Sequence, residues 1–151
     1  MPLARAASDG GGAAVVSRGV AVQLRPDAKQ FAADLWARRR GLKEPANPAV
    51  MKAHFDCNRR RCLPKADDPI RLSAWWTRRT PKGDDVGDLC QGADVVVLRG
   101  QVVPPGCGAL VLTGQDFARG GSVEIYRASR GWRLAWANPL RGVRPWTAPI
   151  R

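Results

Sequence analysis

The sequence predicts an α/β domain with a mixed sheet, short helices and a terminal β-hairpin. The runs 93–98 and 109–113 are short, apolar and rich in branched residues, as is typical of strands covered on both faces. Apolar residues at helical spacing between positions 28 and 36 predict a helix. The segments 122–126 and 132–136 flank a turn-like stretch and predict the hairpin. At 151 residues, the chain is long enough for one domain with its own core.

The first third of the chain is expected to hold one strand and one helix. Residues 1–19 are rich in Ala, Gly and Ser, and we interpret them as a flexible leader, so that the single domain spans residues 20–151. Residues 20–24 predict a short strand. Asp27 is the expected N-cap of the following helix, with Gln30 in capping-box position, and Gly41 is its expected end.

The middle of the chain predicts a cysteine-bounded turn and a strand. Residues 51–55 lead into a hairpin or tight loop around the first two cysteines. Residues 70–76 alternate, which predicts a half-buried strand with Trp76 on the apolar face and Trp75 on the exposed one. A loop and one helical turn are expected over residues 82–90.

The end of the chain adds the hairpin and a tail. A turn or short helix is expected at residues 115–121. Trp132, Leu134 and Trp136 share one face of the last strand, and we interpret them as core residues. The Pro- and Arg-rich residues 139–151 are expected to lie extended along the surface.

Four cysteines carry information about redox state. Their spacing suggests two local disulfides, Cys57–Cys62 and Cys90–Cys107, which would contribute roughly 2 and roughly 3 kcal/mol in the chain-entropy model. Free thiols and a zinc site are the alternatives, although the second pair is too widely spaced for a zinc knuckle. Three arginines lie between the first two cysteines and would lower the thiol pKa of a reduced pair, so a redox role also stays open.

Charge points to an anionic partner. The chain has 25 Lys and Arg against 13 Asp and Glu, a formal net charge of +12. A polyanion or an anionic membrane surface would attract such a chain, although a solvated basic surface is the alternative interpretation. The first residues lack the apolar region of a secretion signal, and no run approaches a membrane span.

Several ordered motifs together resemble a known family. They are Phe55–Cys62, Asp88–Val97, Pro104–Cys107, Gly131–Arg133 and Arg144–Trp146. This set resembles the C-terminal end of proteobacterial ComEC-type DNA-internalisation competence proteins, and the resemblance covers roughly residues 20–151.

The resemblance implies a part of a polytopic inner-membrane DNA channel. The family carries an appended metallo-β-lactamase-like domain outside the membrane, and this chain would be its second half, one sheet layer with its helices from an αββα sandwich. The chain would then be a fragment or split-gene product. It would lie on the periplasmic face of the inner membrane when exported by the membrane portion, and in the cytoplasm if expressed alone.

The chain departs from what a nuclease of that family needs. The histidine-rich motif belongs to the absent first half, and residues 75–79 and 99–102 replace an acidic residue and a His-His-Gly-Ser stretch. The single histidine, His54, has no ligand partner at metal spacing, and we interpret it as incidental. We therefore expect no catalysis, no metal and no cofactor.

The remaining hypothesis is nucleic-acid binding. Single-strand binders combine basic grooves with aromatic platforms. The residues expected to contact single- or double-stranded DNA are Arg59, Arg60, Arg61, Trp75, Arg78 and Arg79. Two alternatives are a structural remnant, which would leave an apolar sheet face bare, and an autonomous periplasmic binding module without a DNA role.

Overall fold

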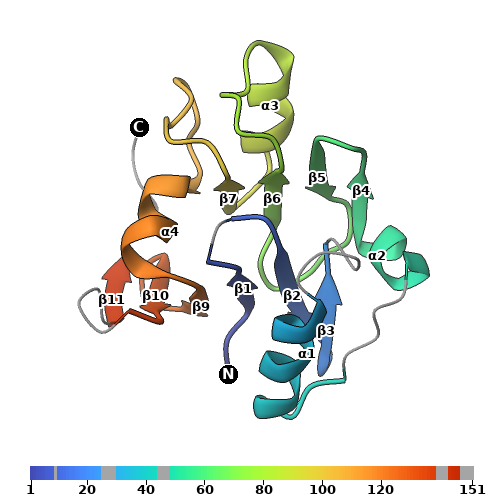
Figure 1. The fold of residues 1–151 in the computed structure, drawn as a ribbon. Coiled ribbons are helices and arrows are strands. Elements are labelled where there is room, and N and C mark those ends of the chain that lie inside the picture. Colours follow the sequence, from blue (N-terminus) through green and yellow to red (C-terminus); the bar gives the residue numbers. More distant parts are fainter. Residues whose placement is uncertain (9, 25–29, 44–47, 139–142, 147–151) are drawn as a thin grey trace.

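Two β-sheets face each other across one core in the computed structural model of the chain, which describes residues 1–8, 10–24, 30–43, 48–138 and 143–146 (Figure 1). The first sheet, sheet A, is antiparallel with the order β11-β10-β9-β1-β2-β3. Its strands are β1 (Ala4–Ala6), β2 (Ala13–Ser17), β3 (Val20–Gln23), β9 (Val123–Arg127), β10 (Trp132–Trp136) and β11 (Val143–Trp146).

The second sheet, sheet B, is mixed, with the order β4-β5-β6-β7-β8. Its strands are β4 (Phe55–Cys57), β5 (Arg61–Pro64), β6 (Leu72–Trp75), β7 (Val95–Leu98) and β8 (Leu110–Leu112). The strands β4, β5 and β6 are antiparallel neighbours, whereas β6, β7 and β8 are parallel. The buried strands predicted at residues 93–98 and 109–113 are therefore confirmed, and they are parallel neighbours.

Short helices lie on both outer faces and at the edges. They are α1 (Gln30–Arg39), α2 (Pro48–His54), α3 (Asp84–Cys90) and α4 (Gly114–Gly120). Leu89 of α3 packs with Val96 and Val111 on the outer face of sheet B, and Ala37 of α1 packs with Val16 and Ala21 on that of sheet A. The inner faces of both sheets share the main core, which includes Val15, Ile125, Leu72, Val97 and Phe117 of α4.

The expected fold class is confirmed at the level of a mixed α/β chain with short helices and a hairpin near its end. The expectation of one sheet layer is wrong, because the described residues build two sheets that cover each other's apolar faces. The bare face expected of a structural remnant is accordingly filled by the opposite sheet. The tail also differs, since residues 143–146 pair with β10 as an edge strand.

The interpretation of residues 1–19 as a flexible leader is wrong. Strand β1 lies between β9 and β2 in the middle of sheet A, and Ala4 and Ala6 have no solvent-exposed surface. Small side chains serve a packing purpose here, because Gly10 passes so close to Phe117 that a Cβ would lie 3.1 Å from its ring. The Ala- and Gly-rich composition therefore reflects close packing between layers.

Several local predictions have clear outcomes. The short strand near residues 20–24, the short helices near residues 82–90 and 115–121, and the core role of Trp132, Leu134 and Trp136 are confirmed. The helix near residues 28–40 is present as α1 and is followed by Gly41 with a positive φ of 68°. Its expected N-cap, Asp27, lies outside the described residues. No helix in the described ranges is long and apolar enough to cross a bilayer.

Both expected disulfides are present. Cys57–Cys62 joins facing residues of β4 and β5, and Cys90–Cys107 joins the end of α3 to the segment that precedes β8. The parallel pairing of β7 and β8 explains the second bridge, because it puts the segments preceding both strands at one end of sheet B. The free-thiol and zinc alternatives are therefore not what the structure contains.

Candidate nucleic-acid interface

The turn between β4 and β5 presents two arginines at one end of sheet B. Asn58 shapes this turn, since its side-chain oxygen accepts hydrogen bonds from the backbone N–H of Arg60 at 2.8 Å and of Arg61 at 3.0 Å. Such a side-chain-to-backbone pattern holds a turn without further packing. The side chains of Arg59 and Arg60 are exposed and line a shallow concavity with Asn58.

The strand register brings a second arginine pair to the same end. Arg61 lies opposite Trp75, and the backbone N–H of Trp76 donates to the carbonyl oxygen of Arg60 at 2.6 Å. The chain then leaves β6 as an exposed loop that contains Arg78 and Arg79. Four exposed arginines, Arg59, Arg60, Arg78 and Arg79, therefore belong to neighbouring loops, and we call this set the arginine end.

Arg61 does not share this exposure. Its guanidinium donates to the carboxylate of Asp88 on α3 at 2.8 Å, and only 21% of its side chain is exposed. An arginine already paired with a carboxylate offers less attraction to a phosphate. The structure thus separates Arg61 from the other predicted DNA-contacting arginines.

The prediction that Trp75 is an exposed platform is wrong. The residue is only 4% exposed and packs with Leu89 and Val96 under α3. Strand β6 is covered on both faces, so the expectation of a half-buried strand fails for the same reason. The indole Nε1 donates to the carbonyl oxygen of Arg79 at 2.9 Å. Trp75 therefore anchors the arginine-bearing loop from inside the protein.

A cleft opens where the three parallel strands end. It has a volume of about 350 Å³ and is lined by Ser8, Arg78, Arg99, Gly100, Gln101, Gly114 and Ala118. Open sheets commonly bind ligands beyond the carboxyl ends of parallel strands. The sequence alone indicates residues 99–102 only as a departure from a metal motif, and it places Ser8 in the supposed leader. Position immediately after a buried strand was the signal that could have marked Arg99.

His54 has a side-chain partner, Asp68, but belongs to no group of described residues that could bind a metal. Its Nδ1 is 3.0 Å from both carboxylate oxygens of Asp68, which is nearly buried. Both residues line an open groove with Val20 and Val50. Across the residues that the structure describes, no group of three or more His, Cys, Asp or Glu side chains is placed to hold a metal ion.

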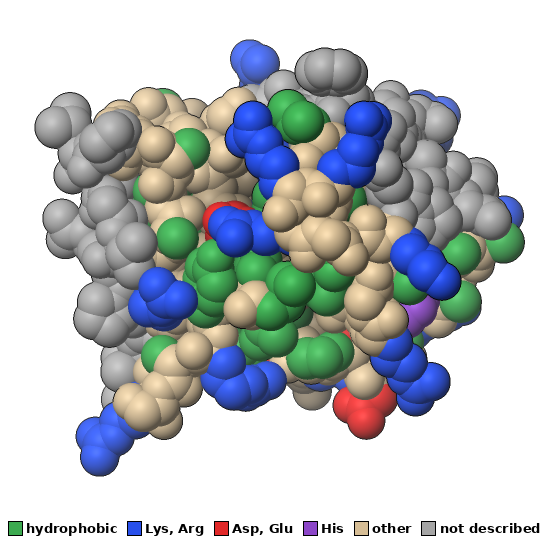
Figure 2. Space-filling view, turned by 90° about the horizontal axis from the view of Figure 1, so that it is seen from below, with side chains coloured by type: hydrophobic (Ala, Val, Ile, Leu, Met, Phe, Trp, Pro, Cys, Tyr) green, Lys and Arg blue, Asp and Glu red, His purple; other side chains and the backbone are tan. Residues whose placement is uncertain are grey.

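The end of the molecule opposite the arginine end has a different surface. Figure 2 shows an apolar area there with Lys and Arg side chains around it. The basic character of the chain is therefore not confined to one face.

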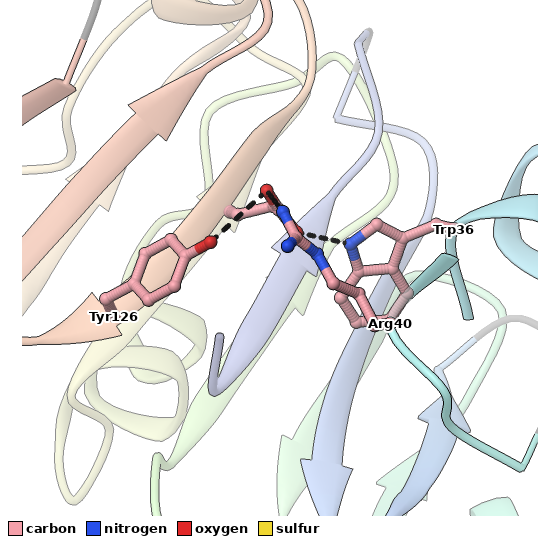
Figure 3. Close-up of polar contacts among 4 residues, drawn as sticks. Trp36, Arg40 and Tyr126 are labelled. Carbon is pink, nitrogen blue, oxygen red and sulfur yellow. Dashed lines mark hydrogen bonds and ion pairs between the residues drawn. The ribbon is translucent and has the colours of Figure 1, made fainter. Parts of the chain in front are cut away.

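A polar cluster around Glu124 attaches α1 to the outer face of sheet A (Figure 3). Glu124 on β9 accepts a hydrogen bond from Trp36 Nε1 at 2.7 Å and from Arg40 Nε at 2.8 Å, and Tyr126 donates to it at 3.5 Å. Burial raises the pKa of Glu124, but the hydrogen bonds from Arg40 and Trp36 outweigh that effect and leave its pKa below the ordinary 4.5. Burial also lowers the pKa of neighbouring Arg5, against the attraction of Glu124.

We expect Glu124→Gln to reduce the free energy of unfolding by about 1 to 2 kcal/mol near neutral pH, because two charge-assisted hydrogen bonds weaken. The lowered native pKa means that this contribution is complete above pH 4.5 and disappears as the pH falls through the native value. Urea titrations from about pH 6 to about pH 3 should show the difference between wild type and variant shrinking with acid. Asp67→Asn, at an exposed position outside the helices and strands, is the charge-matched control; a difference that stays constant with pH would contradict the assignment.

Comparison with known proteins gives no relative for this chain: no protein-family model, no curated protein and no solved structure matches it.

Proposed function

We propose that this chain is a non-catalytic, DNA-binding portion of a DNA-uptake protein, and that it binds a DNA strand at the arginine end. The observation that carries the proposal is the convergence of Arg59, Arg60, Arg78 and Arg79 on neighbouring loops of sheet B. Exposed guanidinium groups attract phosphates over long range and release counterions when they bind. This surface needs no metal or cofactor to bind DNA.

The motif resemblance supplies the biological setting of the proposal. Two sheets with helices on both outer faces are compatible with a degenerate metallo-β-lactamase-like domain of a ComEC-type competence protein. Two disulfides favour an oxidising compartment, which in this setting is the periplasmic side of the inner membrane. The other partner would then be the membrane channel portion of the same or a neighbouring polypeptide.

The arrangement of the arginine end favours a sequence-tolerant mode of binding. The aromatic residue expected there, Trp75, is buried, so base stacking on it does not contribute. Phosphate contacts carry no sequence information by themselves. We therefore expect similar affinity for oligonucleotides of different sequence and a strong dependence on salt.

Fluorescence anisotropy with a labelled oligo-dT should reveal the interaction. Replacing both Arg59 and Arg60 with alanine removes two phosphate contacts, which lowers the salt slope by about 1.4 and the affinity at about 0.1 M salt about 25-fold. Arg78→Ala with Arg79→Ala should have an effect of the same size. Salt titrations of each variant measure both quantities.

The control removes the same charge elsewhere. Arg39 on α1 and Arg130 in the β9–β10 turn are exposed and lie outside the arginine end. Their double replacement by alanine should leave the salt slope unchanged. Equal losses in all three double variants would indicate attraction by net charge alone and would contradict a localised interface, and wild-type affinity that is undetectable at low salt would reject DNA binding.

A further inference from the structure

The cleft at the carboxyl ends of β6, β7 and β8 has the composition of an anion site. Arg78 and Arg99 line it together with the polar side chains of Ser8 and Gln101, and none of its described lining residues is acidic. Its volume of about 350 Å³ falls in the range of small-ligand sites. Proteins with parallel strands commonly bind ligands beyond the carboxyl ends of those strands, because the loops there can vary while the strands stay fixed.

Close backbone packing fixes the two arginines relative to each other. A Cβ at Gly100 would lie 3.0 Å from the carbonyl oxygen of Arg78, and a Cβ at Gly114 would overlap the carbonyl oxygen of Arg99. The backbone N–H of Gly114 also donates to the carbonyl oxygen of Gly100 at 2.8 Å. The loops that follow β6, β7 and β8 thus contact one another through their backbones, so the walls of the cleft are preorganised.

Arg99 has hydrogen-bonding capacity that the protein leaves unused. Its Nε is buried, and among the described residues it has no hydrogen-bond partner. Its Nη1 reaches the carbonyl oxygen of Trp76 only at 3.5 Å, the outer limit of a hydrogen bond. A buried N–H donor without an acceptor costs free energy. Arg99 as a whole is only partly buried and lines the cleft, so its positive charge is available to an anion there.

We propose that this cleft binds a phosphate group between Arg78 and Arg99, with Ser8 and Gln101 available as further donors. A tetrahedral anion with several acceptor oxygens suits guanidinium groups, which donate through two parallel N–H groups. This site deepens the proposed function. One source of the ligand is a phosphate of the bound DNA strand, and for that source the site rests on the proposed function. Free inorganic phosphate is the other source of the same chemistry.

Thermal unfolding of the full chain tests the site with inorganic phosphate as the probe. Above the Kd, each tenfold increase in phosphate should raise the unfolding midpoint of wild type by about 3 to 5 °C relative to sodium chloride of equal ionic strength. Phosphate also stabilises proteins in general by exclusion from their surface. Arg99→Met therefore provides the decisive comparison, because only the specific part of the response should disappear.

Arg99→Met also separates a ligand role from a structural one. Without phosphate, its unfolding midpoint should equal or exceed that of wild type, since the variant removes a buried N–H donor that lacks a partner while it keeps most of the side-chain volume. Arg130→Met, in the exposed β9–β10 turn, should keep the full phosphate response. A phosphate response that Arg99→Met retains overturns the proposal, and so does a midpoint of Arg99→Met well below that of wild type in phosphate-free buffer. Arg78→Met, at an exposed position, should weaken the response independently.

Oligonucleotides distinguish the two sources of phosphate. If a DNA strand supplies the group, oligo-dT should compete with inorganic phosphate and raise its apparent Kd about tenfold at ten times the oligonucleotide Kd. If the stabilisation by oligo-dT and the stabilisation by inorganic phosphate add to each other, the cleft binds free phosphate and not a phosphate of the DNA strand. Oligo-dT binding with no phosphate response would overturn the cleft alone, whereas a phosphate response with no oligo-dT binding would reject the proposed function and leave the cleft assigned.

Discussion

Deleting residues 2–17 is expected to abolish cooperative folding. The deletion removes β1 and β2, separates β9 from β3 in sheet A, and takes Ala4, Ala6 and Val15 out of the main core. Every hydrogen bond that β1 makes to both neighbours is lost at once. Since folded domains are stable by only about 5 to 15 kcal/mol, the loss of two interior strands exceeds what the remaining chain can compensate.

Near- and far-UV circular dichroism during heating measures the result. We expect a broad, non-cooperative change for the shortened chain and a single sharp transition for wild type. A flexible leader would give the opposite result, because removing it would leave the transition unchanged. A native-like transition in the shortened chain would therefore contradict the interior position of β1 and β2.

Single substitutions test the same point without shortening the chain. Ala6→Asp buries a carboxylate among apolar neighbours and should cost several kcal/mol, on the order of 3 to 5. Ser8→Asp introduces the same side chain two residues later at an exposed position and should change stability by about 0.5 kcal/mol or less. Equal effects of the two substitutions would argue against burial of β1.

The fold could be predicted from the sequence wherever apolar periodicity was strong. The runs that became β7 and β8 contain Val and Leu on both faces, which only a covered strand tolerates. The segment containing Ala4 and Ala6 gave no such signal, because alanine is common in flexible, helical and closely packed segments alike. What distinguishes these cases is the distance between layers, and that distance depends on the whole fold.

The candidate interface shows the same division between local and long-range information. The turn that carries Arg59 and Arg60 could be predicted from the Cys57–Cys62 spacing, whereas the hydrogen bonds of Asn58 that shape it could be seen only in the structure. The burial of Trp75 was not predictable from alternation, because α3 covers the face that the pattern marks as exposed. The contact of Glu124 with Trp36 and Arg40 joins residues more than 80 positions apart, and no local pattern predicts it.

Removing both disulfides is expected to have the second large effect. In the chain-entropy model, the bridges contribute roughly 2 and roughly 3 kcal/mol, so their joint loss approaches the lower end of typical domain stability. Cys62 and Cys107 are fully buried, and the second bridge ties α3 to the segment before β8. Reduction should therefore lower the urea midpoint strongly, and the slope should rise because the unfolded chain without its cross-links exposes more surface.

The two bridges should differ in their effect on DNA binding. Cys90→Ala with Cys107→Ala should cost more stability, because the loop is longer, but it leaves the β4–β5 turn closed. Cys57→Ala with Cys62→Ala should cost less stability and yet weaken oligo-dT binding about two- to fivefold, since Arg59 and Arg60 lose part of their preorganisation.

Measuring both properties on both double variants separates the roles of the bridges. Mass spectrometry of the alkylated, unreduced protein first establishes that each variant retains its other disulfide. Urea titration then gives stability, and anisotropy at a temperature where all forms are folded gives affinity. If the two variants lose affinity in proportion to their loss of stability, the Cys57–Cys62 bridge acts only on folding. If the less destabilised variant loses more affinity, the Cys57–Cys62 bridge holds the arginine end in the conformation that binds DNA.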